Sequence, residues 1–271
     1  MKTKINNSNS GFNRRKFLNM TGVTAAGLAV LPHVAFSDVP DNPLQSDRKI
    51  KIGIVGGGFG ASFYWHEHPN CIVHAVSDLR TDRRQHLMKV YGCNKSYESL
   101  GKLILDDEIE AVAVFTGAPD HVRHCKLVMD AGKHVISAVP AAMTIEECEQ
   151  LLEAKLRNDR RYMMAETSYY RNYTIAARDL FKQEAFGELF YSEVEYYHPR
   201  DAGSIARAFR KGQRTWRYGL PPMLYPTHST GFLVGVTKER FTDVSCLGWG
   251  HPQSPYIKER DNAYDNPFDV Q

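Results

Sequence analysis

Short apolar runs alternate with amphipathic stretches along the chain from residue 49 onward. Helical patterns fit between the runs, and one helix is expected from Thr144 to about Arg157, because Glu147 lies three residues after Thr144 and completes a capping box. Strands that alternate with helices are typical of βαβ units with a parallel sheet. The pattern predicts an α/β fold with a parallel-sheet domain over residues 49–165, whose strands are expected at 50–55, 72–77, 111–115, 135–137 and 162–165.

The pattern changes after Glu166, where we expect a second domain to begin. A helix through residues 176–182, closed by Gly187, leads to the run 188–197, in which polar and large residues alternate. Alternation of this kind predicts a strand with one buried face. Residues 241–247 are a further candidate strand.

Residues 1–37 have the composition of a targeting segment. A polar stretch that contains the adjacent residues Arg14 and Arg15 is followed by an apolar run from Gly22 to Leu31 and then by small residues. This order resembles a twin-arginine signal and predicts export to the periplasm by the twin-arginine machinery. The alternative is a short amphipathic helix with two neighbouring arginines. Residues 38–48 are expected to be a linker.

The net charge of +3 depends on this leader. Residues 1–37 hold five of the 34 basic residues and no acid, which leaves 29 basic against 31 acidic residues, about −2. No basic stripe interleaved with aromatic residues is present, so no nucleic-acid partner is predicted. No apolar run approaches the roughly 20 residues that a membrane helix needs, so no stable span is predicted in the mature part.

The five cysteines are scattered and odd in number, which predicts buried thiols and neither a disulfide framework nor a zinc site. His66 and His68 flank a glutamate beside a proline, an arrangement more typical of a solvated loop than of a metal site. We therefore predict no metal ion.

The strand at 50–55 runs into a glycine-rich turn with the pattern Gly56-x-Gly58-x-x-Ala61, after which a helix is expected. The first two glycines allow a tight turn and a close approach of the backbone to a pyrophosphate. The start of the helix would offer amide groups and a positive dipole. The pattern predicts a dinucleotide site, and a sheet turn without a nucleotide is the alternative.

An acidic residue supports the nucleotide interpretation. Asp78 lies 20 residues after Gly58, at the end of the next predicted strand, where its carboxylate can accept the ribose hydroxyls of an adenosine. A carboxylate repels a 2′-phosphate, which favours NAD over NADP as the cofactor, while Arg80 and Arg83 nearby act in the opposite sense.

Together with this turn, residues 116–121 and 131–135 resemble the glucose-fructose oxidoreductase and inositol dehydrogenase family (Gfo/Idh/MocA). The resemblance implies a Rossmann domain and, over residues 166–271, part of an α/β domain with a mainly antiparallel open sheet, apparently cut short. It implies an NAD(P)-dependent oxidoreductase that acts on a sugar or sugar derivative. Together with the predicted export signal, this suggests an exported enzyme with a tightly bound cofactor. The resemblance also places more residues at the cofactor: Phe59, Gly60, Thr116, Pro119, His121, Val139 and Pro140.

The chain departs from the common family pattern at two places. Ala138-Val139-Pro140 stands where most members carry Glu-Lys-Pro, so the usual active-site lysine is absent. Leu224 stands where most members carry an aspartate four residues before the active-site histidine, which is His228 here.

The motifs 139–142, 163–166 and 224–228 are similar to the branch that contains NAD-dependent α-N-acetylgalactosaminidases. In that branch bound NAD oxidises a ring hydroxyl, a base removes the acidified neighbouring proton, the glycosidic bond is eliminated, water adds and the hydride returns. By position, Tyr170 is the candidate base, and Tyr225 and His228 would polarise or deprotonate the hydroxyl. A purely structural role for Tyr170 is equally open.

The expected function is the NAD-dependent oxidation of a sugar or sugar derivative, with redox-assisted glycoside cleavage and non-catalytic binding as the alternatives. An exported NAD enzyme meets no nicotinamide pool and must regenerate its cofactor in each cycle, which fits net-neutral exchange between sugars or redox-assisted glycoside cleavage. A non-catalytic sugar or nucleotide binder is the third candidate. The loop 199–224 is long enough to suggest function. Its arginines could hold an anionic or polyhydroxyl substrate, although a solvated basic loop is the default interpretation, and Trp216 would suit sugar stacking. A homo-oligomer also stays open.

Overall fold

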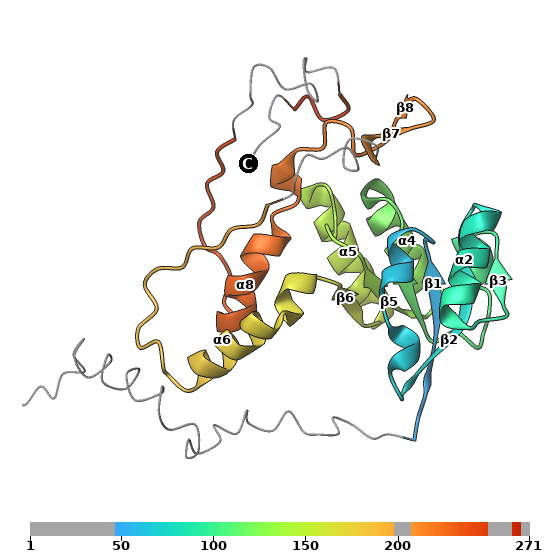
Figure 1. Ribbon diagram of the computed structural model, residues 1–271, viewed down its shortest axis with the longest axis horizontal. Helices are drawn as coiled ribbons and strands as arrows, with labels where there is room; N and C mark the ends of the chain where they lie inside the picture. The colour runs from blue at the N-terminus through green and yellow to red at the C-terminus, as the bar shows by residue number, and fades with distance from the viewer. Residues whose placement is uncertain (1–46, 198–206, 249–261, 267–271) are drawn as a thin grey trace, which may run out of the picture. The chain divides into compact units, whose positions relative to one another are not determined.

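The computed structural model describes residues 47–197, 207–248 and 262–266 (Figure 1). The chain divides into two compact units, residues 1–47 and 48–271. The predicted export signal and all but the end of the predicted linker lie outside the described residues, so both stay predictions. Every described helix and strand belongs to the second unit.

The centre of this unit is a parallel sheet of six strands in the order β3-β2-β1-β4-β5-β6. The five strands predicted from the sequence are confirmed, and the two-residue strand β3 is an addition. In chain order the strands are β1 Ile50–Val55, β2 Cys71–Ser77, β3 Ser96–Tyr97, β4 Ala111–Val114, β5 His134–Ser137 and β6 Tyr162–Met164. The strand order reverses between β1 and β4, and ligands of such sheets bind outside the carboxyl ends of the strands at this reversal.

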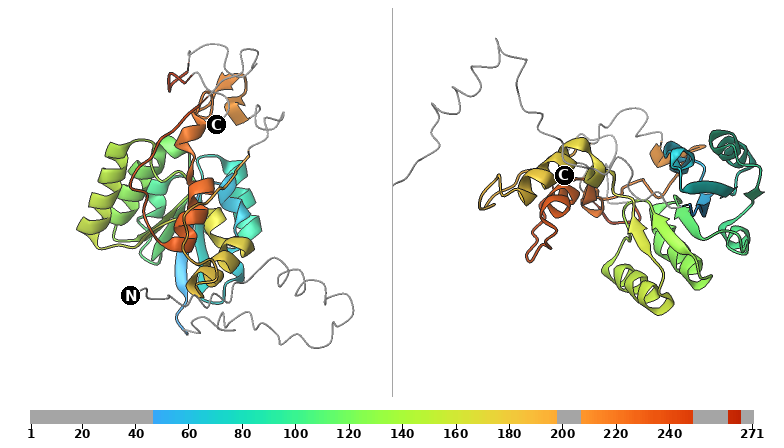
Figure 2. Two further views of the ribbon diagram at one scale, coloured as in Figure 1. Left: turned by 90° about the vertical axis from the view of Figure 1, so that its left-hand side faces the viewer. Right: turned by 90° about the horizontal axis from the view of Figure 1, so that it is seen from below.

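Both faces of the sheet are buried, because successive side chains of a strand point to opposite faces. Along β4, Val112 and Val114 join one core cluster, while Ala113 joins the other. Helices α4 (His121–Asp130) and α5 (Ile145–Asn158) pack on the first face, and α2 (Thr81–Tyr91) packs on the second (Figures 1 and 2). Short helical turns α3 (Leu100–Leu103) and η4 (Ala118–Asp120) complete the connections.

The predicted capping box is present at the start of α5. The Thr144 hydroxyl accepts a hydrogen bond from the Glu147 amide at 3.2 Å, and the Glu147 carboxylate accepts one from the Met143 amide at 2.7 Å. Two amide groups at the helix start thereby gain partners that the helix itself cannot supply.

The prediction of a helix directly after the glycine-rich turn is wrong. Two short 3-10 turns, η2 (Phe59–Ser62) and η3 (Trp65–Glu67), occupy the connection between β1 and β2. The rings of Phe63 and Phe115 lie 4.6 Å apart, and this aromatic packing holds the connection against the sheet in place of a regular helix. An extended helix dipole is therefore absent at this turn, and any anion must rely on individual amide groups.

The described residues beyond 166 are less regular than expected. They form η5 (Thr167–Tyr170), α6 (Asn172–Lys182), η6 (Pro222–Leu224), α8 (Thr227–Thr237) and an antiparallel hairpin of β7 (Phe209–Arg210) and β8 (Gln213–Arg214). The predictions of strands at 188–197 and 241–247 are wrong, because both segments are irregular. A strand needs a neighbour for its amide and carbonyl groups, and Phe190 and Leu247 are 93% and 88% exposed.

All five cysteines lie within the described residues and are free. The prediction of buried thiols is confirmed for Cys93 and Cys125 and wrong for Cys148 and Cys246, which are exposed. Among the described helices, none combines the length and the hydropathy that crossing a bilayer requires.

Candidate functional site

A large hollow of about 1940 Å³ lies at the carboxyl ends of β1, β2 and β4. The glycine-rich turn and Asp78 line it on one side, and Thr116 and Gly117 line it beyond β4. Trp216 and Tyr225, from the segment before α8, line it as well. The hollow thus joins the predicted nucleotide turn to one of the predicted reaction-centre residues.

Two glycines fix the shape of the turn. Gly56 has a φ of 103°, and a Cβ atom there would lie 2.2 Å from the carbonyl oxygen of Phe115. At Gly57 a Cβ atom would lie 2.7 Å from the Cβ of Arg83, in the first turn of α2. The turn passes between two neighbouring elements with no room for side chains.

Gly58 differs from its neighbours because it is exposed, and no atom lies within 3.7 Å of a Cβ built there. Within the described part of the chain, the amides of Gly58 and Phe59 make no hydrogen bond. Unpaired amides at an open glycine turn suit the oxygens of a pyrophosphate. This part of the site fits a dinucleotide even though the regular helix is missing.

Asp78 holds the turn from the next strand. Its two carboxylate oxygens accept hydrogen bonds from the amides of Gly57 at 2.7 Å and Arg80 at 2.8 Å. The guanidinium of Arg83 lies 3.9 Å from the same carboxylate. Each carboxylate oxygen can accept a second hydrogen bond, so Asp78 can shape the turn and still receive a ribose hydroxyl.

His121 has a different position from the one suggested by the resemblance. It is only 1% exposed, and its two ring nitrogens lie 2.7 Å from the Pro140 carbonyl oxygen and 3.1 Å from the Thr116 carbonyl oxygen. The ring therefore ties the end of β4 to the segment after β5. It lines the hollow, but both nitrogens are engaged by the backbone.

Three side chains form a hydrogen-bonded row beside the hollow. His228, at the start of α8, is 6% exposed, and its Nδ1 lies 2.7 Å from Oε1 of Glu166. On the other side of the ring, Nε2 lies 2.9 Å from the hydroxyl of Tyr225. An ionised carboxylate only accepts, so Nδ1 carries the proton and Tyr225 donates to Nε2. We call this set the Tyr-His-Glu row.

Electrostatics support this proton assignment. Burial by itself raises the pKa of Glu166, but hydrogen bonds from His228 and the Ser168 amide outweigh it, and the pKa lies below its usual range. Burial raises the pKa of Tyr225 to about 12. A free phenolate at Tyr225 is therefore scarce near neutral pH, and this hydroxyl works best by passing its own proton to His228 as it receives another.

The structure places the third predicted reaction-centre residue at a different cavity from Tyr225. Tyr170 is 53% exposed and lines a smaller cavity that the hollow does not include. Sequence reasoning missed Glu166 and Tyr196 as members of the site. Glu166 could have been found as an acid directly after a predicted strand, at the sheet edge where ligands bind. Tyr196, whose ring centroid lies 4.4 Å from that of His228, carried no local signal.

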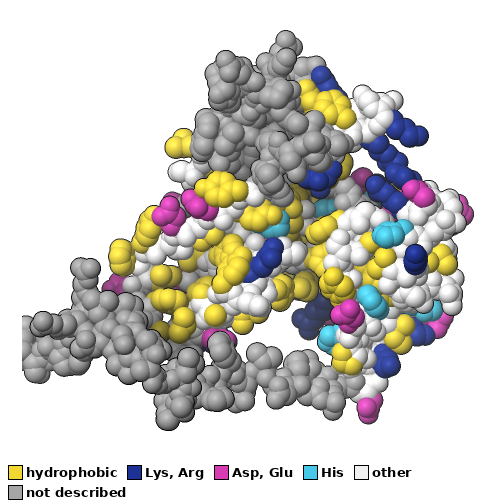
Figure 3. All heavy atoms as spheres, in the orientation of Figure 1, with side chains coloured by type: hydrophobic (Ala, Val, Ile, Leu, Met, Phe, Trp, Pro, Cys, Tyr) yellow, Lys and Arg dark blue, Asp and Glu magenta, His cyan; other side chains and the backbone are white. Residues whose placement is uncertain are grey.

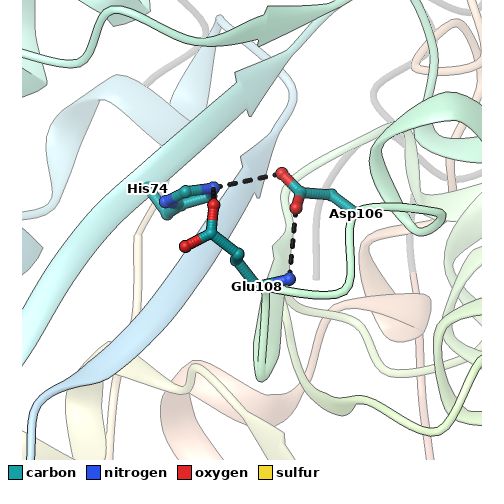
Figure 4. A group of neighbouring side chains, drawn as sticks. All are labelled: His74, Asp106 and Glu108. Carbon is teal, nitrogen blue, oxygen red and sulfur yellow. Dashed lines mark hydrogen bonds and ion pairs between the residues drawn. The ribbon is translucent and has the colours of Figure 1, made fainter.

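One group outside the hollow has the chemistry of metal ligands. His74 of β2 lies 3.1 Å from Asp106 and 3.4 Å from Glu108, both in the turn before β4 (Figure 4). Both carboxylates already have lysine partners, Lys95 at 2.8 Å for Asp106 and Lys51 at 2.5 Å for Glu108. A cation would have to displace these ammonium groups, so we interpret the group as an ion-pair network.

Comparison with known proteins finds a family similar to the sheet domain. Residues 50–166 match the profile of the Gfo/Idh/MocA family, described as an oxidoreductase family with an NAD-binding Rossmann fold. The match covers 117 of the 271 residues, and over this range the chain is similar to that family. Among the curated relatives, a glycosyl hydrolase family 109 protein of Shewanella amazonensis is 28% identical over 249 residues, which is 82% of this chain and 54% of the relative.

A second relative, the alpha-N-acetylgalactosaminidase of Shewanella oneidensis, is 28% identical over 252 residues, which is 80% of this chain and 53% of the relative. The chain thus spans about half the length of the curated relatives it matches. Among solved structures, scyllo-inositol dehydrogenase from Lactobacillus casei with NAD(H) and scyllo-inositol is 22% identical with a TM-score of 0.49, over 52% of this chain and 43% of that one.

The sheet domain brings most of its predicted cofactor residues to the hollow. Those that line it are Gly56, Gly58, Phe59, Asp78, Thr116, His121 and Val139. Four others do not line it: Gly60, Ala61, Pro119 and Pro140. Gly60 is buried below the turn, where a Cβ atom would lie 3.3 Å from Ile54 and from Phe115.

A basic hairpin borders the outer part of the hollow. Arg207, Arg210, Arg217 and Trp216 line it, and dark-blue side chains gather over β7 and β8 at the upper right of Figure 3. The indole of Trp216 rests on the turn after β4, because a Cβ atom at Gly117 would lie 2.9 Å from its Nε1. The Arg217 guanidinium lies 4.3 Å from the centre of the same ring.

Proposed function

We propose that this protein binds NAD in the hollow and oxidises a hydroxyl group of a sugar or sugar derivative, with Tyr225 and His228 managing the hydroxyl proton. The observation that carries the proposal is that Tyr225 lines the same hollow as the glycine-rich turn while its hydroxyl is hydrogen-bonded to a buried histidine. The family match of residues 50–166 supports the NAD part.

The residues of this chain would divide the work as follows. The amides at Gly58 and Phe59 would hold the pyrophosphate, and Asp78 would hold the adenosine ribose and disfavour a 2′-phosphate. The nicotinamide, when bound, accepts a hydride from the carbon that bears the hydroxyl. Tyr225 would take the hydroxyl proton and pass its own to His228, a form of general-base catalysis worth about 10² to 10⁴ in rate.

A redox-neutral glycoside cleavage is the second candidate, because the curated relatives carry the names glycosyl hydrolase family 109 protein and alpha-N-acetylgalactosaminidase. In that cycle the first oxidation would use the same row, and a further base would remove the proton beside the new carbonyl. Tyr170 is the residue that the sequence proposes for this base, although it lines another cavity.

One experiment tests both candidates. The protein purified without residues 1–37 is assayed for bound nicotinamide nucleotide and then incubated with free sugars and p-nitrophenyl glycosides in deuterated water. Accumulation of NADH without release of p-nitrophenol supports net oxidation. Phenol release with deuterium beside the anomeric carbon supports cleavage. A protein that neither contains nor takes up the nucleotide overturns both, and one that binds it without turnover is the non-catalytic binder.

We further propose export by the twin-arginine machinery. The adjacent arginines Arg14 and Arg15 and the apolar run after them support it. Replacing both arginines with lysine should retain the protein in the cytoplasm, as fractionation and immunoblotting would show. Equal amounts of the two forms in the periplasm would refute export by this route.

A further inference from the structure

The inner end of the Tyr-His-Glu row opens toward a second cavity. Glu166 lines a space of about 280 Å³, bounded by Tyr169 and Tyr170 of η5 and by residues of α8 that include Thr227 and Gly231. Tyr225 lines the large hollow and does not line this space. The row therefore crosses from one cavity to the other through the buried ring of His228.

Two enclosed polar atoms belong to residues that line this second cavity. Oε2 of Glu166 and Oγ1 of Thr227 are both enclosed. The Thr227 hydroxyl interacts with the Glu166 carboxylate and, like His228, helps to lower the pKa of this carboxyl. The cavity beside this pair has room for water molecules.

Gly231 keeps this end of the row accessible. A Cβ atom there would lie 3.0 Å from Cγ of Glu166, so a side chain would press on the carboxylate from α8 and fill the space beside it. The absence of a side chain at this helix position leaves the cavity open against Glu166.

From this geometry we propose that the second cavity is the exit for the proton released in the oxidation, with Glu166 as the positioning residue that directs it there. The inference rests on the proposed function. When the O–H bond of the substrate breaks, its proton goes to the Tyr225 oxygen and the electron pair of the neighbouring C–H bond leaves with the hydride to the nicotinamide. The Tyr225 proton moves to Nε2 of His228, the Nδ1 proton moves to Glu166, and water in the cavity receives it.

The exit has a physical advantage over the hollow. Nucleotide and substrate would fill the hollow during turnover, and a proton released into it would stay beside the developing carbonyl group. A separate cavity delivers the proton to solvent without opening the reaction centre to water, which would otherwise weaken the electrostatic interactions there.

The first test replaces the carboxylate. Glu166→Gln keeps the size of the side chain and can still accept from His228 Nδ1, but it cannot take up a proton. We expect kcat to fall about 100-fold with KM within about threefold of the wild type. Glu166→Ala should lose at least as much activity, and added formate should restore it at least tenfold with saturation, because formate can enter the cavity and replace the carboxylate.

Two further variants distinguish a proton exit from simple support of the fold. Formate should not rescue His228→Asn, which lacks the middle of the row. In Glu166→Ala combined with Val234→Trp, the indole would cover the cavity, which Val234 lines at present, and rescue should disappear. Unchanged kcat in Glu166→Gln, or formate rescue that survives the Trp substitution, would overturn the inference.

A measurement without turnover separates this inference from the proposed function. In the wild type, the proton on Nδ1 of His228 should give a strongly downfield NMR signal because of its 2.7 Å contact with Glu166. The signal should be lost in Glu166→Ala and return with formate. If no substrate is oxidised, the proposed function fails whatever the spectrum shows. If substrate is oxidised but the Nδ1 proton signal is unchanged in Glu166→Ala, the proton exit is refuted and the proposed function stands.

Discussion

The glycine-rich turn gives the sharpest test of the cofactor site, through Gly56→Ala. The backbone there has a φ of 103°, outside the left-handed region that L-residues tolerate, which costs about 1 to 3 kcal/mol. The new Cβ atom would also lie 2.2 Å from the Phe115 carbonyl oxygen. Non-bonded carbon contacts lie near 3.5 Å, so β1 and β4 would have to separate locally by about 1 Å.

A matched control is available at Gly132, which has a φ of 75° and no atom within 4 Å of a built Cβ. Gly132→Ala should cost about 1 to 2 kcal/mol, the strain of the left-handed conformation alone. Gly56→Ala should cost about 3 to 5 kcal/mol in urea unfolding, and the displaced amides should weaken NADH binding at least tenfold by fluorescence titration. Equal losses of stability in the two variants, with unchanged NADH affinity in Gly56→Ala, would refute the reasoning.

Two other predictions concern acidic residues. Asp78→Asn leaves one acceptor oxygen in place of two, so one of the backbone amides that Asp78 now holds would lose its partner or face an NH₂ group. The variant should lose about 1 to 2 kcal/mol of stability and bind NADP more tightly relative to NAD. An unchanged ratio of the two dissociation constants would contradict the role assigned to Asp78. Burial tends to raise the pKa of Asp106, but hydrogen bonds, the one from Lys95 first, lower it from 3.8 to about 2. Its contribution to stability is therefore present above about pH 4 and is lost as the pH falls through about 2, so urea unfolding of Asp106→Asn should vary less with pH in this interval than that of the wild type.

The sheet domain could be predicted because its signals are local. The apolar runs of β1, β2, β4, β5 and β6 each predict a short strand, and the capping box at Thr144 fixes where α5 begins. The glycines of the turn are required by a positive φ and by a close backbone approach, which depend on a few neighbouring residues only. Such signals survive in the sequence whatever follows in the chain.

The failure directly after the turn has a physical reason. The connection between β1 and β2 is short and rich in aromatic residues. Packing of Phe63 against Phe115 stabilises an irregular connection more than a regular helix would. The expected helix dipole was therefore a wrong inference from a correct glycine pattern. The amides of the turn carry the fit to a pyrophosphate instead.

The region after residue 166 was difficult for the opposite reason. Alternation in 188–197 resembles a strand, but strand formation depends on a partner, and no described segment pairs with it. Helix α8 contains glycines and β-branched residues with low helix propensity. Tertiary packing nevertheless stabilises this helix. A Cβ atom at Gly235 would lie 3.1 Å from the ring of Tyr169, so glycine lets the helix pack closely against this ring.

The sequence by itself determined the parallel sheet, the glycine-rich turn and the acid that holds it, since each is encoded within a few consecutive residues. Only the tertiary structure decided that Glu166 and His228, 62 positions apart, share a hydrogen bond, and that Tyr225 lies at the hollow while Tyr170 lies at a different cavity. A proton path requires atoms within hydrogen-bond distance of one another, and the packing of α8 against η5 brings them there.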